Sequence, residues 1–151
     1  MSDSSYNFSS AIEDFRSARQ RASIQEVIAR VTGRSNQLLS YDDVAKKLPL
    51  QSRTERGLKN IPLDAIVGSV GRYTDFTRTF LPLQDSDRER WARVKAAMVT
   101  GAGLPPIEVY QVGDVYFVLD GNHRVSIARQ EGLNTIEAYV TEFKTDIKLT
   151  P

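Results

Sequence analysis

The stretch LPPIEVYQVGDVYFVLDGNHRVSIARQEGLNTIEAYVTEF, residues 104–143, decides the fold that we predict for this chain. Within it, residues 107–110 and 115–119 are mainly β-branched or aromatic and flank the pair Gly113-Asp114. Two such runs joined by a short Gly-containing turn are typical of a β-hairpin. The sequence therefore predicts a hairpin here.

Directly after the hairpin, Asp120-Gly121-Asn122 interrupts the strand pattern. The next residues predict a helix that ends at Gly132, and residues 136–143 predict a further strand. Hairpin, tight loop, helix and strand together indicate the α+β class, with a small mixed sheet and packed helices.

Upstream, residues 8–34 predict a helix that ends at Gly33. Its apolar positions recur at spacings of three and four, apart from one short step at Ile24; they are Ile12, Phe15, Ala18, Ala22, Ile24, Val27, Ile28 and Val31. The helix is expected either to pack on the domain or to dimerise with a second copy.

Shorter elements are predicted between this helix and residue 104. A capping box at Ser40 starts a helix that ends near Leu48, before Pro49. Residues 51–59 are polar and basic, as in a connector, and residues 61–67 indicate a strand that enters a turn at Gly68.

The segment 68–71 is then expected to be a flexible loop that leads to Arg72. A capping box of Ser86 and Glu89 predicts a further helix, which ends at Gly101 or Gly103. Three apolar residues form a stripe along this helix: Trp91, Val94 and Met98.

Composition sets wider limits. The 151 residues carry 20 Lys+Arg and 19 Asp+Glu, and 40% of them are hydrophobic, which favours a folded domain over a disordered chain. The absence of cysteine excludes disulfides, thiolate metal sites and cysteine nucleophiles. No apolar run approaches the roughly 18–20 residues that span a bilayer, so we expect no membrane partner and a cytoplasmic location. We assign residues 1–50 to a helical N-terminal extension and residues 58–151 to the domain.

The segment Asp120-Gly121-Asn122-His123-Arg124 carries the most informative chemistry. The first N–H groups of a helix lack intrahelical partners and lie at the positive end of its dipole. Gly121 would let an anion approach, Asn122 could cap the helix, and His123 and Arg124 could donate to phosphate oxygens. These residues indicate a phosphate site. The alternative is an ordinary Asp-Gly turn that caps a helix, with Arg124 on a solvated face.

The order of these segments resembles the ParB N-terminal/sulfiredoxin superfamily over residues 58–143. The resemblance is carried by residues 104–109, the hairpin and residues 120–124, together with residues 61–66 followed by Arg72. It implies that nucleotide phosphates bind at the junction of loop and helix. Members include partition proteins that bind cytidine triphosphate, sulfiredoxin, free-serine kinases and ParB-like nucleases.

Carried over by position, the resemblance assigns Gly121–Arg124 to phosphate binding and Arg72 to a second basic contact. Asp120 matches the acid that begins the motif in the serine-kinase branch. Sulfiredoxin requires a cysteine where this chain has Asn122, so sulfiredoxin activity is excluded. The loop also differs from that of partition proteins, and no helix-turn-helix domain follows it before Pro151, so we do not expect a complete partition protein.

A kinase-like mechanism follows from the same resemblance. Asp120 would accept a proton from a substrate hydroxyl or hold Mg²⁺, while His123 and Arg124 neutralise the phosphoryl group. Glu108 is a second metal candidate, unless it is simply the solvent-facing residue of an alternating strand. The expected ligands are Mg²⁺ with ATP, ADP or CTP, and the expected reaction is phosphoryl transfer or NTP hydrolysis. The alternative function is a non-catalytic DNA-associated regulatory module or a ParB-like nuclease.

Two weaker patterns concern nucleic acids. Residues 43–48 and 51–58 could form a small helix-turn-helix that presents Arg53 and Arg56 to DNA. Residues 68–71 resemble the loop of a KH domain, but that loop requires a helix on each side, and a strand is predicted before it.

Overall fold

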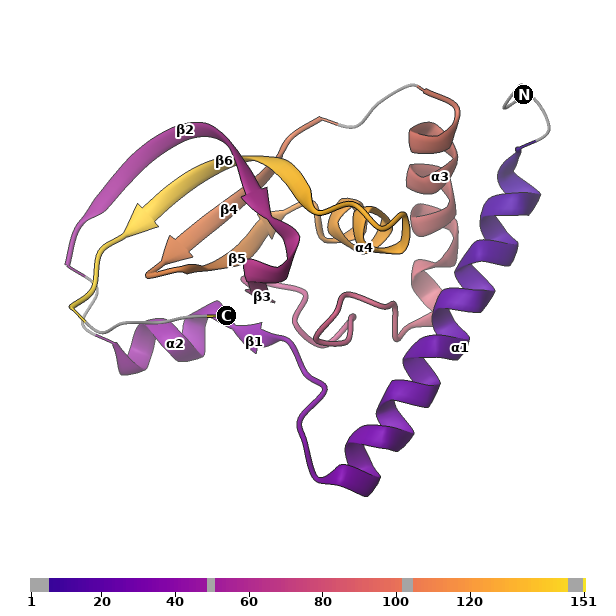
Figure 1. Ribbon diagram of the computed structural model, residues 1–151, viewed down its shortest axis with the longest axis horizontal. Helices are drawn as coiled ribbons and strands as arrows, with labels where there is room; N and C mark the ends of the chain where they lie inside the picture. Colours follow the sequence, from indigo (N-terminus) through magenta and orange to yellow (C-terminus); the bar gives the residue numbers. More distant parts are fainter. Residues whose placement is uncertain (1–5, 49–50, 102–104, 147–150) are drawn as a thin grey trace.

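A computed structural model of the chain describes residues 6–48, 51–101, 105–146 and 151. It confirms the predicted α+β class: helices pack against a six-stranded mixed sheet in the order β1-β3-β5-β4-β6-β2 (Figure 1). The elements are α1 Phe8–Thr32, β1 Leu39–Ser40, α2 Tyr41–Lys47, β2 Arg53–Pro62, β3 Ile66–Ser69, α3 Arg88–Val99, β4 Ile107–Val112, β5 Val115–Asp120, α4 Asn122–Gln130 and β6 Thr135–Phe143. None of the helices in these ranges has the length and apolar content needed to cross a membrane.

The unit predicted from residues 104–143 is confirmed. β4 and β5 form an antiparallel hairpin, and Gly113 in its turn has a φ of 61°. β5 ends beside the start of β4, and α4 connects that end of the sheet to β6, which runs parallel to β4. Buried side chains of these four elements, including Ile107, Val118, Val125 and Ala138, pack in one apolar core with residues from β2, β3 and the loops.

The predicted connector at residues 51–59 is wrong, and so is the second helix of the helix-turn-helix. This segment belongs to β2, which pairs antiparallel with β6 from Arg53 opposite Phe143 to Pro62 opposite Thr135. β2 is the edge of the sheet, and most of its side chains are exposed. An edge strand held by main-chain hydrogen bonds tolerates a polar sequence, so its composition resembled that of a loop.

The predicted strand at residues 61–67 and the flexible loop after it are also corrected. β2 ends at Pro62, a 3₁₀ turn spans Leu63–Ala65, and β3 follows. Gly68 lies inside β3, where an added Cβ would be 2.3 Å from the carbonyl oxygen of Leu39 and 2.7 Å from Cδ1 of Phe117. Glycine is therefore required here for the close approach of neighbouring strands rather than for flexibility.

α1 and α2 agree with their predicted ranges to within two residues. Gly33 ends α1 with a φ of 71°, and the Ser40 hydroxyl accepts from the Asp43 N–H at 3.4 Å at the start of α2. The first half of α1 packs on α3, where the rings of Phe15 and Trp91 meet edge to face with centroids 5.7 Å apart.

The capping box predicted for α3 is wrong. A 3₁₀ turn over Asp85–Asp87 leads into the helix, and its N-cap Asp87 makes no side-chain capping hydrogen bond. The predicted apolar stripe is confirmed, since Trp91 is buried and Val94 and Met98 pack against the same cluster. The helix ends at Val99, just before Gly101, whereas Gly103 lies outside the described residues.

Candidate anion-binding site

A pocket of about 360 Å³ lies where β5 meets the N-terminus of α4, with α3 alongside. The residues that line it are Arg72, Arg90, Val94, Leu119, Asp120, Gly121, Asn122, His123 and Arg124. Arg72 and the segment 120–124, which are far apart in the sequence, are thus brought together. The structure shows them around one open space, and their predicted roles in binding or catalysis remain predictions.

A β-bulge directs the end of β5 toward this pocket. Asp120 pairs with Glu108 and Val118 pairs with Val109, which leaves Leu119 as the extra residue on β5. A bulge bends a strand and increases its local twist. Leu119 and Asp120 are consequently both exposed and both line the pocket.

Gly121 is required at this corner, although for a different reason from the predicted approach of an anion. Its φ is 115°, a backbone conformation that L side chains rarely adopt. An added Cβ would also lie 2.4 Å from Cγ2 of Ile107 in the core. Glycine therefore lets the chain turn from β5 into α4 while the loop packs tightly on β4.

The N-terminus of α4 presents main-chain donors to the pocket. The N–H of Val125 donates to the Gly121 carbonyl at 3.0 Å, so the N–H groups of residues 122–124 precede this first bond of the helix. The prediction that Asn122 caps the helix is wrong, because Gly121 is the N-cap and no side chain caps it. Asn122 is instead the first helical residue, and its Oδ1 atom is buried without a hydrogen-bond partner in the described residues.

Arg72 is held at the pocket by the chain that leaves β3. The Ser69 hydroxyl accepts from the Arg72 N–H at 3.2 Å and donates to the Val118 carbonyl at 3.2 Å. The Arg72 guanidinium donates to Asp75 at 2.8 Å, and its side chain is 48% exposed. The guanidinium is therefore positioned by its neighbours but still accessible from the pocket.

The Arg124 side chain is held by more hydrogen bonds than the sequence indicated. Its Nη1 donates to the carbonyls of Pro105 and Pro106 at 2.9 and 2.8 Å, and its Nη2 donates to Asp120 at 3.0 Å. Its side chain is 17% exposed, so the alternative of a solvated face is wrong. Arg124 anchors the segment before β4 and also contributes positive charge to the pocket wall.

His123 is buried against α3. Its Nε2 lies 3.5 Å from Oδ1 of Asp87, and its ring meets Phe76 edge to face at 5.4 Å between centroids. Burial lowers the pKa of His123, the Asp87 carboxylate opposes this effect, and the charges of Arg90 and Arg72 reinforce it. We therefore expect a neutral imidazole at neutral pH.

The sequence patterns did not identify two residues at this site, Asp87 in the turn before α3 and Arg90 in α3. Arg90 lines the pocket, and Asp87 is buried beneath it beside His123. Asp87, Arg90 and Val94 follow the three-and-four spacing of a single helix face, which was the available signal.

The two predicted metal ligands are only partly brought together. Glu108 is the register partner of Asp120, but it is outside the pocket lining. Across the part of the chain that the structure describes, no group of three or more His, Cys, Asp or Glu residues could hold a metal ion. Mg²⁺ often binds through one or two carboxylates plus substrate phosphates, and Asp120 is the one of the two predicted ligands that lines the pocket.

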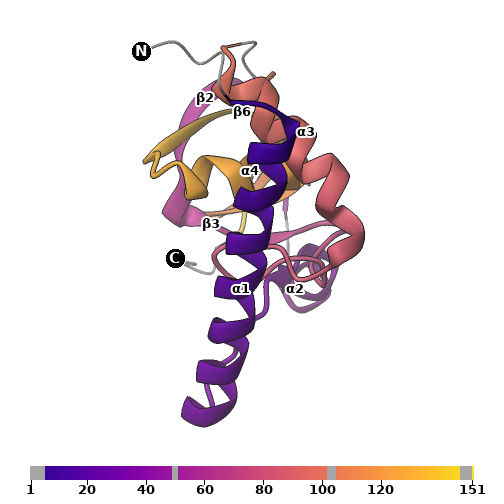
Figure 2. The same ribbon diagram turned by 90° about the vertical axis from the view of Figure 1, so that its right-hand side faces the viewer.

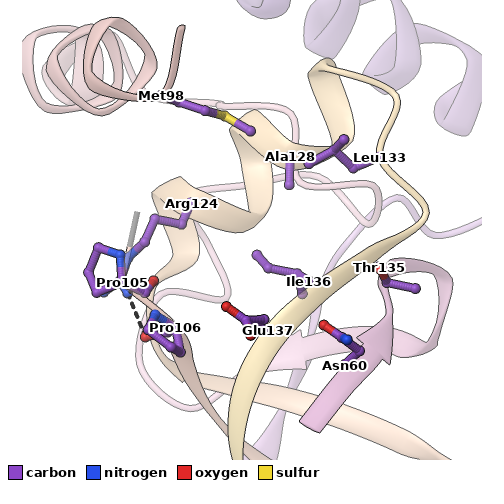
Figure 3. A pocket seen from close by; sticks show the side chains of 10 residues that line it. All are labelled: Asn60, Met98, Pro105, Pro106, Arg124, Ala128, Leu133, Thr135, Ile136 and Glu137. Atoms are coloured by element: carbon purple, nitrogen blue, oxygen red, sulfur yellow. Dashed lines mark hydrogen bonds between the residues drawn. The ribbon is translucent and has the colours of Figure 1, made fainter. Parts of the chain in front are cut away.

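A second pocket, of about 330 Å³, lies on the other side of Arg124. Figure 3 shows Arg124 and the two prolines on one side, and Glu137 of β6 with Asn60 of β2 on the other. Its walls are mainly apolar, and they include Met98, Ala128, Leu133 and Ile136. Arg124 therefore lines both pockets, one mainly apolar and the other lined by charged side chains.

Comparison with known proteins identifies a family for this chain. The family model of the ParB N-terminal domain matches residues 51–150. The chain belongs to the ParB N-terminal domain family. This match confirms the predicted superfamily, and it includes the edge strand β2, whereas α1, β1 and α2 lie outside the matched range.

Among solved structures, sulfiredoxin from Arabidopsis thaliana is similar, with 20% sequence identity and a TM-score of 0.43. The similarity covers 58% of this chain and 86% of that one. No curated protein matches the chain.

Proposed function

We propose that this ParB-family chain binds a nucleotide or another phosphorylated small molecule in the pocket at the N-terminus of α4. One observation carries the proposal: Arg72, Arg90 and Arg124 line the pocket from three separate segments, whereas Asp120 is the one acidic residue among the described residues that line it. Guanidinium groups bind phosphate through charge-assisted, paired hydrogen bonds. The main-chain donors of α4 favour the same kind of ligand.

The three arginines differ in availability. Among the described residues, Arg90 makes neither an ion pair nor a side-chain hydrogen bond, so its charge is free for a ligand. Arg72 would exchange part of its contact with Asp75 for the phosphate. Arg124 keeps its two proline carbonyls and acts mainly by its charge. We therefore expect Arg90 and Arg72 to make the principal phosphate contacts.

Isothermal titration calorimetry with ATP, ADP and CTP, with and without Mg²⁺, tests this proposal. Removal of one charge-assisted hydrogen bond costs about 1.5–3 kcal/mol, so Arg90→Ala and Arg72→Ala should each weaken binding by roughly 10- to 100-fold. Arg93→Ala is the matched control, because Arg93 is exposed on the same helix but outside the pocket lining. Unchanged affinity in both pocket variants, or an equal loss in the control, would contradict the proposal.

We further propose that the bound nucleotide undergoes Mg²⁺-dependent phosphoryl transfer or hydrolysis. Asp120 is exposed at the pocket and could take a proton from the attacking hydroxyl or water after its contact with Arg124 loosens. His123, kept neutral by burial, could donate a hydrogen bond to the phosphoryl group. Asp120→Asn should slow product formation, measured as ADP or phosphate formed, by roughly 100-fold or more. Its affinity for the nucleotide, measured by calorimetry, should change far less.

Membership of the ParB family favours DNA association as a second candidate function. The helix-turn-helix predicted for DNA reading is not formed, since residues 53–62 are strand β2. DNA association would therefore use another surface and act as a regulatory or nuclease function. Gel shifts at 50 and 200 mM salt, with and without nucleotide, test it, because phosphate contacts weaken steeply with salt. Cleavage of DNA in the presence of Mg²⁺ would identify a nuclease.

A further inference from the structure

α1 carries two apolar faces, and the structure covers only one of them. Phe15, Ala18 and Ala22 are buried against the rest of the protein. The short step in spacing at Ile24 is where the apolar pattern changes to another side of the helix. The second set, which we call the distal stripe, consists of Ile24, Val27, Ile28 and Val31, with exposures of 54%, 54%, 55% and 81%.

The distal stripe faces away from the rest of the chain. At about 100° per residue, its centre lies roughly 150° around the helix from the line through Ala18 and Ala22. In Figure 2 the second half of α1 extends beyond the body of the protein. Its side-chain hydrogen bonds to the body come from Arg21 to Gln130 and from Thr79 to Gln25, both away from the stripe centre.

Folding of this chain does not account for the stripe. Isoleucine and valine are weaker helix formers than the Ala, Glu, Lys or Arg that usually occupy exposed helix positions. Four of them side by side form a contiguous apolar surface, which on a soluble protein commonly marks an interaction site. The stripe therefore indicates a partner that covers it.

We propose that this partner is a second copy of the chain, bound antiparallel across the distal stripe. The spacing 24, 27, 28, 31 is identical in both directions. A two-fold axis between residues 27 and 28 therefore places Ile24 against Val31 and Val27 against Ile28 of the other copy. Such an isologous contact is self-complementary by symmetry, as closed dimers require.

The charges beside the stripe are compatible with this pairing. At 3.6 residues per turn, Arg30 flanks the stripe on one side, and Ser23 lies on the same side about two turns earlier. The two-fold axis puts Arg30 of one copy level with Gln25 of the second copy, with Ser23 of that copy about 3 Å further along, rather than beside another arginine. Arg30 therefore meets no arginine of the second copy across the stripe.

The exposed area sets the strength of the dimer. Complete burial of one such side chain removes on the order of 100 Å² of apolar surface, so four half-exposed residues supply roughly 250 Å² per copy. A stable interface buries about 800 Å² per partner. Even with the flanking side chains included, we expect a weak, reversible dimer with a dissociation constant on the order of 100 µM.

Sedimentation equilibrium of the full chain between about 10 µM and 1 mM tests the association. The average mass should rise from 16.9 kDa toward twice that value, and the double variant Ile24→Ser with Ile28→Ser should remain monomeric. Leu58→Ser is the matched control, because Leu58 is a similarly exposed aliphatic residue on β2 and should leave association unchanged. A monomer at every concentration, or equal association of the double variant, overturns the proposal.

Cysteine cross-linking tests the orientation, since the natural chain contains no cysteine. Val27→Cys lies beside the two-fold axis and should form a disulfide with its own copy. Ile24→Cys and Val31→Cys should cross-link poorly alone, because their symmetry mates are about 10 Å apart along the helix, but efficiently when mixed. Efficient self-cross-linking at all three positions would show a parallel pair and reject the antiparallel arrangement.

Discussion

Gly121 combines two structural requirements at one residue. Its backbone has a φ of 115°, and the space that a side chain would occupy is filled by Ile107. Either requirement alone favours glycine. Together they fix the geometry of the turn that presents the α4 N-terminus to the pocket, so the site depends on a residue that has no side chain.

Substitution of Gly121 by alanine is expected to destabilise the fold by about 2–4 kcal/mol, since it adds both backbone strain and overpacking. Gly132→Ala is the matched control, because Gly132 also has a positive φ, of 73°, but open space around it. Its cost should be about 1 kcal/mol. Urea denaturation measures both values, and equal losses would show that the contact with Ile107 is unimportant.

His123 links the site to the pH dependence of stability. Its pKa is lowered in the folded state by burial, whereas the unfolded chain takes up the proton near pH 6.5. The unfolded state therefore binds more protons below that pH, and stability falls as the pH drops. At neutral pH and above, both states are unprotonated at this residue, so it contributes no pH dependence there.

His123→Gln is accordingly expected to remove part of the acid sensitivity. Between pH 7.5 and 5, the wild-type chain should lose up to about 2 kcal/mol more stability than the variant. Urea denaturation across this range, with both proteins in the same buffers, measures the difference. An identical pH dependence of the two proteins would mean that His123 takes up its proton equally well in the folded state.

At the scale of elements, α1 divides into a packed half and an exposed half. The packed half contributes Phe15, which is 2% exposed and meets Trp91 edge to face. The exposed half carries the distal stripe. The same helix thus serves folding at one end and, in our proposal, association at the other.

The two halves are expected to respond differently to truncation of a side chain. Phe15→Ala should cost about 3–5 kcal/mol, as for other buried phenylalanines, whereas Ile28→Ala should change stability by less than about 0.5 kcal/mol. Denaturation at a few micromolar, well below the expected dimerisation range, makes this comparison for the monomer. A large loss for Ile28→Ala at that concentration would show that the distal stripe belongs to the folded core.

At the scale of the whole molecule, α1 contributes to the core although it lies outside the range that matches the family. Its buried residues share one cluster with Leu81, Trp91 and Ile127. This cluster supports α3 and α4, which carry Arg90 and the segment 122–124. The anion-binding pocket is therefore built on a support that includes the N-terminal helix.

Removal of residues 1–34 is expected to destabilise the remaining chain and to expose Trp91 to water. Trp91 is the one tryptophan of the sequence, so its fluorescence reports directly on this cluster. We expect a red shift of its emission and a lower melting temperature, with weaker nucleotide binding as a consequence. Unchanged emission in the truncated chain would show that α3 and α4 keep their packing without α1.

The sequence alone determined the elements whose signals are local. The hairpin, α4 and β6 follow from alternation, turn residues and helical spacing within a window of about 40 residues, which is why residues 104–143 were predicted correctly. The candidate pocket residues 120–124 were found for the same reason, because the end of a strand and the start of a helix are adjacent in the chain.

Only the tertiary structure decided the features that depend on distant segments. β2 is a strand because its main chain pairs with β6, some 80 residues later. Its polar side chains give no local sequence pattern that predicts this pairing. Gly68 is required by Leu39 and Phe117, and Arg90 and Asp87 reach the pocket only because α3 packs beside α4. Main-chain hydrogen bonds and close packing act between residues that are neighbours in space. Local sequence patterns report only on residues that are close along the chain, so they do not predict these contacts.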